Sequence, residues 1–402
     1  MNIEIRHLKP DELEASRWLG KYAFGMWTDD EMKPEDYEWV NPNHTLAAFV
    51  DGQLAAKVVT QPFEQVIRGV VKPMGGVAGV ASYPEFRRRG LIRQLIHAFF
   101  VKMRADGQSI SALYPFRENF YERYGYVTTN NNLSVKVETK SLAHHIPLMR
   151  QDNETWSYER KRARDYKLEW LAQVRKMGVI HHGFVFYTPE STPDGLWKRA
   201  AKDQHLLAVK QNGTLAAAAR FLSKGYMDSG ELTVREMYWQ SPEARDRLLA
   251  YLAAHADAVP VTWLPVPYGT NFHNWINTPT VQIEAKIGFV VLMGRVVDVV
   301  GALADLPVPV NRELVIEVGD KQCQWNNGRY LLRGENGRLS AIPTDRLADI
   351  NMTIEGLSAL IYGTLPAAEA EYRGWINGLT TDTRTLLDIW FPQMILFNTN
   401  HF

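Results

Sequence analysis

A run of small and apolar residues that leads into three consecutive arginines constrains the fold of this chain more than any other segment. Residues 79–82 read Gly-Val-Ala-Ser and predict the end of a buried strand. The turn that follows carries Arg87, Arg88 and Arg89, and Gly90 precedes an amphipathic helix predicted over residues 91–105. The N–H groups at a helix start have no partner in the helix and carry partial positive charge. This strand–turn–helix unit is therefore suited to a pyrophosphate, to which arginines add charge and bidentate donors.

The arginine turn has other interpretations. Taken alone, three adjacent arginines also fit a solvated surface, and that alternative stays open at this point. A nucleic-acid surface is disfavoured because 45 Lys and Arg balance 45 Asp and Glu, for a formal net charge of zero. Gly75, Gly76 and Gly79 lack the spacing of a dinucleotide fingerprint and fall before or within the strand. We therefore reject dinucleotide binding and predict no nucleic-acid partner.

A second motif follows the helix. Residues 109–114 predict another buried strand, and residues 116–126 read Phe-Arg-Glu-Asn-Phe-Tyr-Glu-Arg-Tyr-Gly-Tyr, which predicts a short helix ending at a glycine. Together the two motifs resemble the GNAT N-acetyltransferases, with their acyl-CoA loop (Gln/Arg)-x-x-Gly-x-(Gly/Ala) and their Phe-Tyr-x-x-(aromatic/Leu)-Gly-(Phe/Tyr) helix. Arg87 and Gly90 fill the first fixed positions of the loop, while Ile92 stands where a small residue is commoner. The resemblance implies an acetyl-CoA-dependent N-acetyltransferase.

Length and composition limit the classes of protein to which the chain can belong. A chain of 402 residues with 46% hydrophobic and 22% charged residues predicts a soluble protein of two or three domains. The single cysteine, Cys323, excludes an internal disulfide framework and lies in a strand-like run, where we interpret it as a packing residue. No leader pattern or stretch of about eighteen apolar residues occurs. We therefore predict a cytoplasmic protein with no membrane partner.

The chain also contains an internal repeat. Residues 44–56 predict two strands joined by an Asp-Gly turn, and residues 205–217 repeat the pattern with an Asn-Gly turn. A further strand and a helix follow each hairpin. In the second copy, the turn at residues 240–245 reads Gln-Ser-Pro-Glu-Ala-Arg, without glycine and with an acid that repels phosphate. We interpret the second copy as a degenerate GNAT-like domain that does not hold acetyl-CoA.

The last third of the chain changes character again. It predicts a sheet followed by helices at 354–362, 367–373 and 381–391, and residues 349–363 resemble the sterol-carrier-protein fold. The predicted fold class is therefore mixed α+β and α/β, with tandem GNAT-like domains, the first active and the second degenerate, followed by a sterol-carrier-protein-like α+β domain. The predicted domain bounds are 1–150, 151–290 and 291–402.

This order of domains resembles the Eis (enhanced intracellular survival) family over the whole chain. In that family the C-terminal carboxylate of the chain enters its own active site, and this chain ends in the aromatic Phe402. The resemblance implies a homo-oligomer, a hexamer. It further implies that the backbone at Val80, Ala81 and Ser82 pairs with the pantetheine arm of acetyl-CoA. The remaining cofactor-binding residues that it implies are Arg87, Arg88, Arg89, Gly90, Leu91, Ile92, Arg93, Phe116 and Arg117.

The chemistry of acetyl transfer suggests a role for each of two residues that the resemblance implies at the active site. A tyrosine, with a pKa near 10, keeps its proton at neutral pH and can donate it to the departing thiolate. Tyr121 holds the tyrosine position of the Phe-Tyr motif and is the predicted general acid, whereas Tyr124 and Tyr126 are interpreted as core aromatics. The Phe402 carboxylate is predicted to act as a base, with a pKa raised by burial, or to orient the cationic amine.

Some alternatives stay open. The substrate is a small-molecule amine, such as an aminoglycoside-like polyamine, or a lysine side chain, and the sequence does not decide between them. No metal is predicted, because the histidines of the pairs 144–145 and 181–182 are adjacent and their side chains diverge. The alternative function is a catalytically weak protein that binds an apolar ligand or a partner through the sterol-carrier-like domain.

Overall fold

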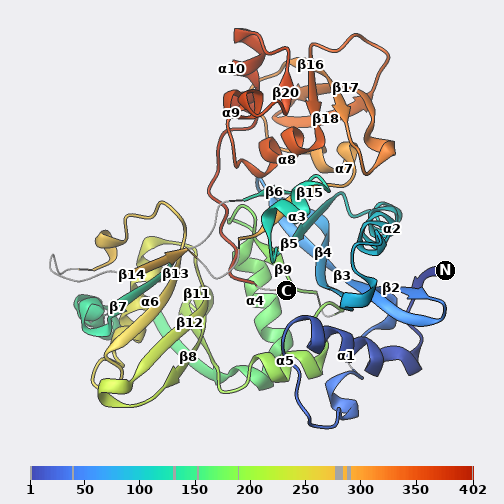
Figure 1. Cartoon of the computed structure of the whole chain (residues 1–402). Helices are drawn as coiled ribbons and strands as arrows, with labels where there is room; N and C mark the ends of the chain where they lie inside the picture. The colour runs from blue at the N-terminus through green and yellow to red at the C-terminus, as the bar shows by residue number, and fades with distance from the viewer. Residues whose placement is uncertain are drawn as a thin grey trace. The chain divides into compact units, whose positions relative to one another are not determined.

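The chain folds into two compact units (Figure 1). The computed structural model describes residues 2–38, 40–129, 133–151, 154–188, 190–276, 284–287, 291–400 and 402. The first unit combines residues 1–129, 292–394 and 402, and the second combines residues 130–291 and 395–401. Each unit therefore contains segments that are far apart in the sequence.

A mixed sheet forms the N-terminal part of the first unit. Its strands follow the order β1-β2-β3-β4-β5-β15-β6, and only β4 and β5 among these neighbours are parallel. The strands are β1 Ile3–His7, β2 Thr45–Val50, β3 Gln53–Ile67, β4 Val70–Ser82, β5 Ile110–Leu113, β6 Val127–Thr128 and β15 Met293–Val296. The helices are α1 Leu13–Ala23, α2 Leu91–Ala105 and α3 Glu118–Glu122. The predicted strand–turn–helix–strand–helix order of the two motifs is confirmed.

Helices cover both faces of this sheet, which explains why β2 is buried along its whole length. Leu46 and Ala48 belong to the core that α2 shares, whereas Ala47 and Phe49 pack in a separate cluster with Leu13 of α1. Successive side chains of a strand point to opposite faces. Helices α1 and α2 therefore lie on opposite sides of the sheet.

Strands β4 and β5 separate at a bulge in β4. The parallel ladder between the two strands ends at the pair Val77–Leu113, while β4 continues to residue 82. Just beyond this pair, the register between β3 and β4 shifts by one residue, between Lys57 and Val59 of β3. Gly79 lies in this bulge at φ +55°, and a Cβ there would lie 2.9 Å from Cγ2 of Val59. The bulge bends the strand, as such insertions do, and the absence of a side chain at Gly79 permits it.

The C-terminal part of the first unit is a second sheet with its own helices (Figure 1, orange and red). Its strand order is β18-β17-β16-β19-β20, and β16 and β19 are parallel. The strands are β16 Glu313–Gly319, β17 Gly328–Glu335, β18 Arg338–Pro343, β19 Ile350–Thr353 and β20 Ile376–Asn377. The helices are α7 Val299–Leu303, α8 Ile354–Tyr362, α9 Ala367–Tyr372 and α10 Thr381–Trp390. The predicted sterol-carrier-like α+β arrangement is confirmed.

The hairpin between β3 and β4 joins the two sheets of the first unit. Arg68 and Gly69 form its turn, both with positive φ. The Arg68 guanidinium donates to the carbonyl oxygens of Leu360 (2.6 Å), Ile361 (3.0 Å) and Pro392 (2.9 Å). The first two carbonyls end α8, where backbone acceptors have no helical partner. Burial lowers the pKa of Arg68 to about 10, so it stays charged at neutral pH and holds the C-terminal segment on the first sheet.

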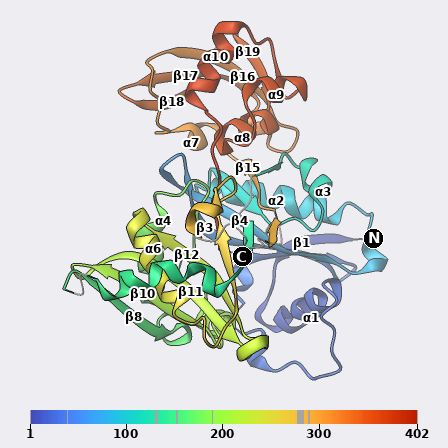
Figure 2. The ribbon, with the colours of Figure 1, turned by 90° about the vertical axis from the view of Figure 1, so that its left-hand side faces the viewer.

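The second unit repeats the plan of the first sheet (Figure 2). Its strand order is β14-β7-β13-β12-β11-β10-β8, with β12 and β13 parallel, and α6 packs on β10, β11 and β12. The strands are β7 Leu133–Glu138, β8 Trp156–Arg162, β10 His205–Gln211, β11 Thr214–Lys224, β12 Glu231–Trp239, β13 Val261–Val266 and β14 Glu284–Ile287. The remaining elements are β9 Val185–Phe186, α4 Lys167–Gly178, α5 Asp194–Ala200 and α6 Pro242–Ala253.

Two details confirm that the N-terminal part of the first unit and the second unit are tandem copies of one fold. The predicted hairpin turns Asp51-Gly52 and Asn212-Gly213 both have two residues with positive φ, the backbone that two-residue hairpins require. Strand β12 also carries a register shift against β11, between Arg220 and Phe221, at the place that corresponds to the bulge of β4. The predicted fold class of tandem GNAT-like domains followed by a sterol-carrier-like domain is therefore correct.

The domain boundaries at 150 and 290 stay predictions. The structure places β7, which precedes residue 150, in the sheet of the second unit. It places β15, which follows residue 290, between β5 and β6 in the sheet of the first unit. Sequence periodicity did not reveal this exchange, because a short apolar strand carries no mark of the sheet that it joins.

The bulge generates a stability prediction. Gly79→Ala combines a left-handed backbone, which costs about 1–2 kcal/mol for other residues, with a clash against Val59. Gly107→Ala is the matched control, because Gly107 has φ +72° and open space around a Cβ. We expect the midpoint of thermal unfolding to fall further for Gly79→Ala than for Gly107→Ala. Equal midpoints in the two variants would show that the bulge tolerates a side chain.

Candidate functional site

The turn between β4 and α2 presents backbone N–H groups instead of a capping side chain. Arg88 has φ +62° and Gly90, the residue before α2, has φ +75°. No side chain caps the helix, and its first turn contains no acidic residue. The first helical hydrogen bond runs from the Gln94 N–H to the Gly90 carbonyl (3.1 Å), so the N–H groups of residues 91–93 have no partner within the helix. Such a turn with left-handed residues forms an anion-binding concavity.

A cavity of about 1070 Å³ opens over this turn, slightly more than the roughly 300–1,000 Å³ of ordinary ligand sites. Its lining includes five arginine side chains and no aspartate or glutamate. The formal net charge of the whole chain is zero, so the cavity concentrates positive charge locally. The lining residues are Ala23, Phe24, Val80, Ala81, Ser82, Phe86, Arg87, Arg88, Arg89, Gly90, Leu91, Ile92, Arg93, Phe116, Phe120, Arg123, Tyr124 and Gln322.

The cavity brings together the predicted cofactor residues, with one exception. All of them except Arg117 line it. Arg117 is exposed and immediately precedes α3, whereas the neighbouring Phe116 lines the cavity with 64% of its side chain exposed. Their contacts with a cofactor stay predictions. The lining residues that sequence reasoning missed include Phe86 and Arg123, which are near the predicted residues in sequence, and Gln322, for which the sequence offered no signal.

The predicted acid Tyr121 is buried beside the cavity lining. Its ring packs edge-on against Phe116 (5.8 Å between centroids) and Phe120 (5.0 Å). Burial raises the pKa of Tyr121 above its ordinary value, so the phenol keeps its proton at neutral pH. Tyr124 lines the cavity directly, and burial raises its pKa too, although Arg123 and Arg93 oppose the shift. Both tyrosines keep their protons, but Tyr124 is in the cavity lining, whereas Tyr121 lies behind Phe116 and Phe120.

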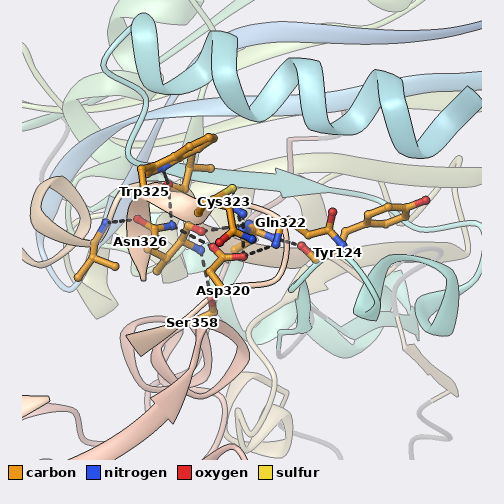
Figure 3. A network of polar contacts seen from close by, with 12 residues as sticks. Tyr124, Asp320, Gln322, Cys323, Trp325, Asn326 and Ser358 are labelled. Atoms are coloured by element: carbon orange, nitrogen blue, oxygen red, sulfur yellow. Dashed lines mark hydrogen bonds and ion pairs between the residues drawn. The ribbon is translucent and has the colours of Figure 1, made fainter. Parts of the chain in front are cut away.

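Figure 3 shows the polar network that contains Tyr124 and Asp320. An arginine from β15, Arg295, joins these two residues and fixes the wall that contains Tyr124. Arg295 donates to the Tyr124 carbonyl and, at 2.5 Å, to the carboxylate of Asp320, and both partners of this ion pair are fully buried. Gly125 has φ +83°, and a Cβ there would lie 2.6 Å from Nη1 of Arg295. The glycine of the Tyr-Gly-Tyr motif thus makes room for the guanidinium. No sequence pattern pointed to Arg295.

Cys323 belongs to the same buried cluster. It lies in the loop between β16 and β17, so the prediction of a strand-like run was wrong at this position. The chain leaves the β16–β17 ladder after Gly319, because the Asp320 carboxylate turns inward to its ion pair with Arg295. The Cys323 Sγ is 3.0 Å from Nη2 of Arg295, and burial raises the pKa of the thiol to about 12. A protonated, buried thiol is a packing group and not a nucleophile.

The last residue of the chain lies in the first unit. The Phe402 ring packs on Phe63 of β3 (4.6 Å between centroids) and on Tyr114 (5.2 Å), which follows β5. A Cβ on Gly76 of β4 would lie 2.9 Å from the Phe402 ring, so a glycine is needed beneath it. Phe402 therefore lies over β3 and β4 and beside the end of β5. The role of its carboxylate stays a prediction.

Residues 397–399 are held by hydrogen bonds within the second unit. The Phe397 N–H donates to the His182 carbonyl (2.9 Å), and the Val185 N–H donates to the Asn398 side chain (3.1 Å). The Tyr238 and Thr399 hydroxyls lie 2.6 Å apart, in a buried contact. These bonds fix an extended segment that has no regular secondary structure of its own.

The corresponding helix start in the second unit is capped and acidic. The Ala244 N–H donates to the Ser241 side chain (3.2 Å), and Pro242 at the first helical position has no N–H to offer. Glu243, in the first turn, accepts hydrogen bonds from the Arg247 guanidinium at 3.1 and 3.2 Å. These features remove the donors and the charge that the α2 turn presents, which supports the interpretation of a degenerate copy.

Comparison with known proteins identifies two segments of the chain. Residues 4–129 match the family model described as an acetyltransferase (GNAT) domain, which spans the strands, the arginine turn and α2. Residues 4–129 are therefore a GNAT acetyltransferase domain. Residues 299–395 match the sterol carrier protein domain. The chain is an enzyme, an acyltransferase of the GNAT N-acetyltransferase type.

Relatives of similar length share the whole arrangement. An uncharacterized N-acetyltransferase of Streptomyces coelicolor is 23% identical over 384 residues, and one of Streptomyces griseus is 22% identical over 404 residues, each alignment covering 90% of both chains. A GCN5-related N-acetyltransferase of Anabaena variabilis shares the fold with a TM-score of 0.85 at 17% identity, over 100% of each chain. Eis1 of Mycobacterium abscessus shares it with a TM-score of 0.78 at 18% identity, over 99% of this chain and 100% of that one.

Within the described ranges, no helix is both long enough and apolar enough to cross a bilayer. The same residues contain no group of three or more His, Cys, Asp or Glu side chains placed to hold a metal ion.

Proposed function

We propose that this GNAT enzyme binds acetyl-CoA in the arginine-lined cavity and transfers the acetyl group to a primary amine. The observation that carries the proposal is the cavity's lining of five arginines and no carboxylate around an uncapped helix start. The phosphates of CoA need charge, bidentate donors and backbone N–H groups, which this lining supplies. When bound, acetyl-CoA supplies the acetyl group as a thioester.

The parting of β4 from β5 supports the position proposed for the pantetheine arm. Beyond Val77, β4 has no ladder partner on the β5 side among the described residues. The backbone at Val80 and Ser82, with Ala81 between them, lies on this stretch and lines the cavity. An amide-bearing arm could hydrogen-bond to this free strand edge as a neighbouring strand would. We propose that the arm runs from the α2 turn along this edge.

We propose Tyr121 as the residue that assists the departing sulfur. In the transfer, a bond forms between the amine nitrogen and the acetyl carbon, and the bond from that carbon to sulfur breaks. The thiolate that leaves needs a hydrogen-bond donor or a proton. A CoA-type thiol has a pKa of about 8.5, well below the raised pKa of Tyr121. The phenol therefore stabilises the thiolate mainly as a hydrogen-bond donor, because complete transfer of its proton is uphill.

The Phe402 carboxylate is proposed to attract and orient the cationic amine or to accept its proton. Phe402 packs beside the residue that follows β5 and over Gly76 of β4. A terminal carboxyl has an ordinary pKa near 3.5, so it acts as a base only if its environment raises that pKa. As a fixed anion, the Phe402 carboxylate can attract an ammonium group without any change in its pKa.

The amine and the assembly are proposed on the resemblance to the Eis family. We propose that the substrate is an aminoglycoside-like polyamine or a lysine side chain. We also propose that the enzyme is cytoplasmic and forms a homo-hexamer, whose mass can be measured by light scattering. The fold shared with Eis1 supports this assignment. The alternative, an apolar ligand in the sterol-carrier-like domain, gains no support from α8, because nearly all of its residues are buried in packing.

The cofactor proposal predicts one acetyl-CoA site per chain. Arg88→Ala removes a charged donor at the turn, and we expect the Kd to rise about 10- to 100-fold, the effect of one charge-assisted hydrogen bond. Arg338→Ala is the control, because Arg338 is an exposed arginine of β18 outside the cavity. This substitution should leave the Kd unchanged. Isothermal titration calorimetry measures both quantities. Two sites per chain, or an unchanged Kd for Arg88→Ala, would contradict the assignment.

The acid proposal predicts different consequences for two tyrosines. Tyr121→Phe keeps the packed ring and removes only the donor, so kcat should fall roughly 10²–10⁴-fold while the Kd for acetyl-CoA stays the same. Tyr124→Phe, one helical turn away in the cavity lining, should change kcat much less. Steady-state kinetics with a thiol-release assay separates the two. A larger loss for Tyr124→Phe would transfer the role to that residue.

The terminus proposal predicts that a C-terminal extension inactivates the enzyme. Adding residues after Phe402 converts the carboxylate into an uncharged amide, and kcat should fall severely. Phe402→Ala keeps the carboxylate but loses the packing on Phe63 and Tyr114, so a smaller loss is expected. The same residues added at the N-terminus are the control. Full activity of the C-extended protein, with a normal circular dichroism spectrum, would show that the carboxylate takes no part.

A further inference from the structure

One residue of the cavity lining comes from outside the acetyltransferase domain. Gln322 belongs to the loop between β16 and β17 of the sterol-carrier-like segment, nearly two hundred residues beyond the end of the GNAT match. It lies in the first unit together with α2 and α3. The site of the first domain therefore includes a part of the C-terminal domain.

Gln322 bridges two walls of the cavity. Its side-chain amide donates to the Arg123 carbonyl at 3.1 Å, at the end of α3. The backbone carbonyl oxygen of Gln322 lies 3.1 Å from Nδ1 of His97, on α2. The glutamine thus joins the helix that follows the arginine turn to the helix that carries the Phe-Tyr motif. Its position is fixed by both, and it is only half-buried.

A buried ion pair sets the shape of the Gln322 loop (Figure 3). The Asp320 carboxylate accepts from the backbone N–H groups of Gln322 (2.9 Å) and Cys323 (3.0 Å) and from the Asn326 side chain (3.0 Å), in addition to Arg295 (2.5 Å). All of these donors converge on one carboxylate that has no solvent exposure. The same Arg295 donates to the Tyr124 carbonyl. One arginine therefore positions both Tyr124 and the Gln322 loop at the cavity.

The loop is also anchored to α2. The Trp325 indole N–H donates to the Val297 carbonyl at 2.9 Å, and the Arg104 guanidinium lies over the Trp325 ring at 5.1 Å. Arg104 belongs to the last turn of α2, so the loop follows the helix from His97 toward its C-terminal end. The pyrophosphate site proposed above lies at the opposite, N-terminal end of α2. Gln322 therefore lies on the α2 and α3 walls of the cavity, whereas the pantetheine arm is proposed on the β4 wall.

We propose that Gln322 is a cofactor-binding residue that contacts the nucleotide part of acetyl-CoA, and that the Arg295–Asp320 pair is its positioning device. The proposal rests on the proposed binding of acetyl-CoA in the cavity. The nucleotide carries a phosphorylated ribose and a base, whose acceptors and donors an amide side chain can satisfy. The sterol-carrier-like segment thereby contributes a binding group to the acetyltransferase site.

The test compares two glutamines of the same loop. Gln322→Glu places a carboxylate beside the phosphorylated ribose of the nucleotide, and we expect the Kd for acetyl-CoA to rise at least tenfold at 0.15 M salt. Gln324→Glu makes the same change at an exposed position outside the cavity lining and keeps an acceptor for Asn327, so the Kd should stay within twofold of wild type. In kinetics, Gln322→Glu should raise the KM for acetyl-CoA and leave kcat and the KM for the amine nearly unchanged.

A second probe locates the contact on the cofactor. Acetyl-4′-phosphopantetheine lacks the nucleotide, so wild type and Gln322→Glu should use it with equal KM values. Gln322→Glu also removes the amide donor to the Arg123 carbonyl, so its thermal unfolding midpoint should fall below that of Gln324→Glu, which keeps its hydrogen-bond acceptor. Gln322→Asn shortens the side chain without adding charge and should give an intermediate Kd for acetyl-CoA.

Each contrary result has a distinct meaning. An unchanged Kd for Gln322→Glu, with wild type binding acetyl-CoA, overturns this inference and leaves the proposed function standing. Equal losses in Gln322→Glu and Gln324→Glu would show a general charge effect and overturn the specific contact. An equal loss with acetyl-4′-phosphopantetheine would overturn the assignment to the nucleotide. Failure of wild type itself to bind acetyl-CoA overturns both proposals.

Discussion

The bulge of β4 at Gly79 is the constraint on which the rest of the site depends. A continuous ladder between β4 and β5 would leave no backbone donors or acceptors for a ligand, since each strand would satisfy the other. The bulge ends the pairing at Val77 and Leu113 while β4 continues to Ser82. The turn and α2 then begin from the free end of β4. The strand edge and the helix start thus become two parts of one cavity.

The buried pair of Arg295 and Asp320 has a different role. Removing two charges from water costs several kcal/mol per ion unless geometry and further hydrogen bonds offset it. Here the carboxylate has four donors, and the guanidinium also bonds to the Val296 and Tyr124 carbonyls and lies over the Phe100 ring. Such a saturated pair contributes little net stability but permits only one arrangement of its loops. We infer that its role is to fix the wall of the cavity.

Local patterns predicted much of the fold. The helices over 91–105 and 354–362 have the expected bounds, because amphipathic spacing and a following glycine or turn define them. The two hairpins follow from Asp-Gly and Asn-Gly turns. The exchange of β7 and β15 between the units was not predictable, since pairing between distant strands depends on the packed whole. The split of the C-terminal tail between the units has the same origin.

The candidate site was predicted where its residues are contiguous. The arginine turn and the strand before it, residues 80–93, form one wall of the cavity because a local chain reversal brings them together. Gln322, Arg295 and Asp320 were missed, because only tertiary folding brings them to that wall. Tyr124 was weighed as a core aromatic, and the structure shows it both buried and in the lining.

The most direct test of the central claim is a crystal structure of the full chain with acetyl-CoA. The account predicts pyrophosphate oxygens within hydrogen-bond distance of the backbone N–H groups at the start of α2, and one cofactor per chain. The thioester should lie toward the end of β5, where Tyr114 and Phe402 pack. A cofactor bound at the capped turn of residues 240–245, or on the C-terminal sheet, would contradict the account.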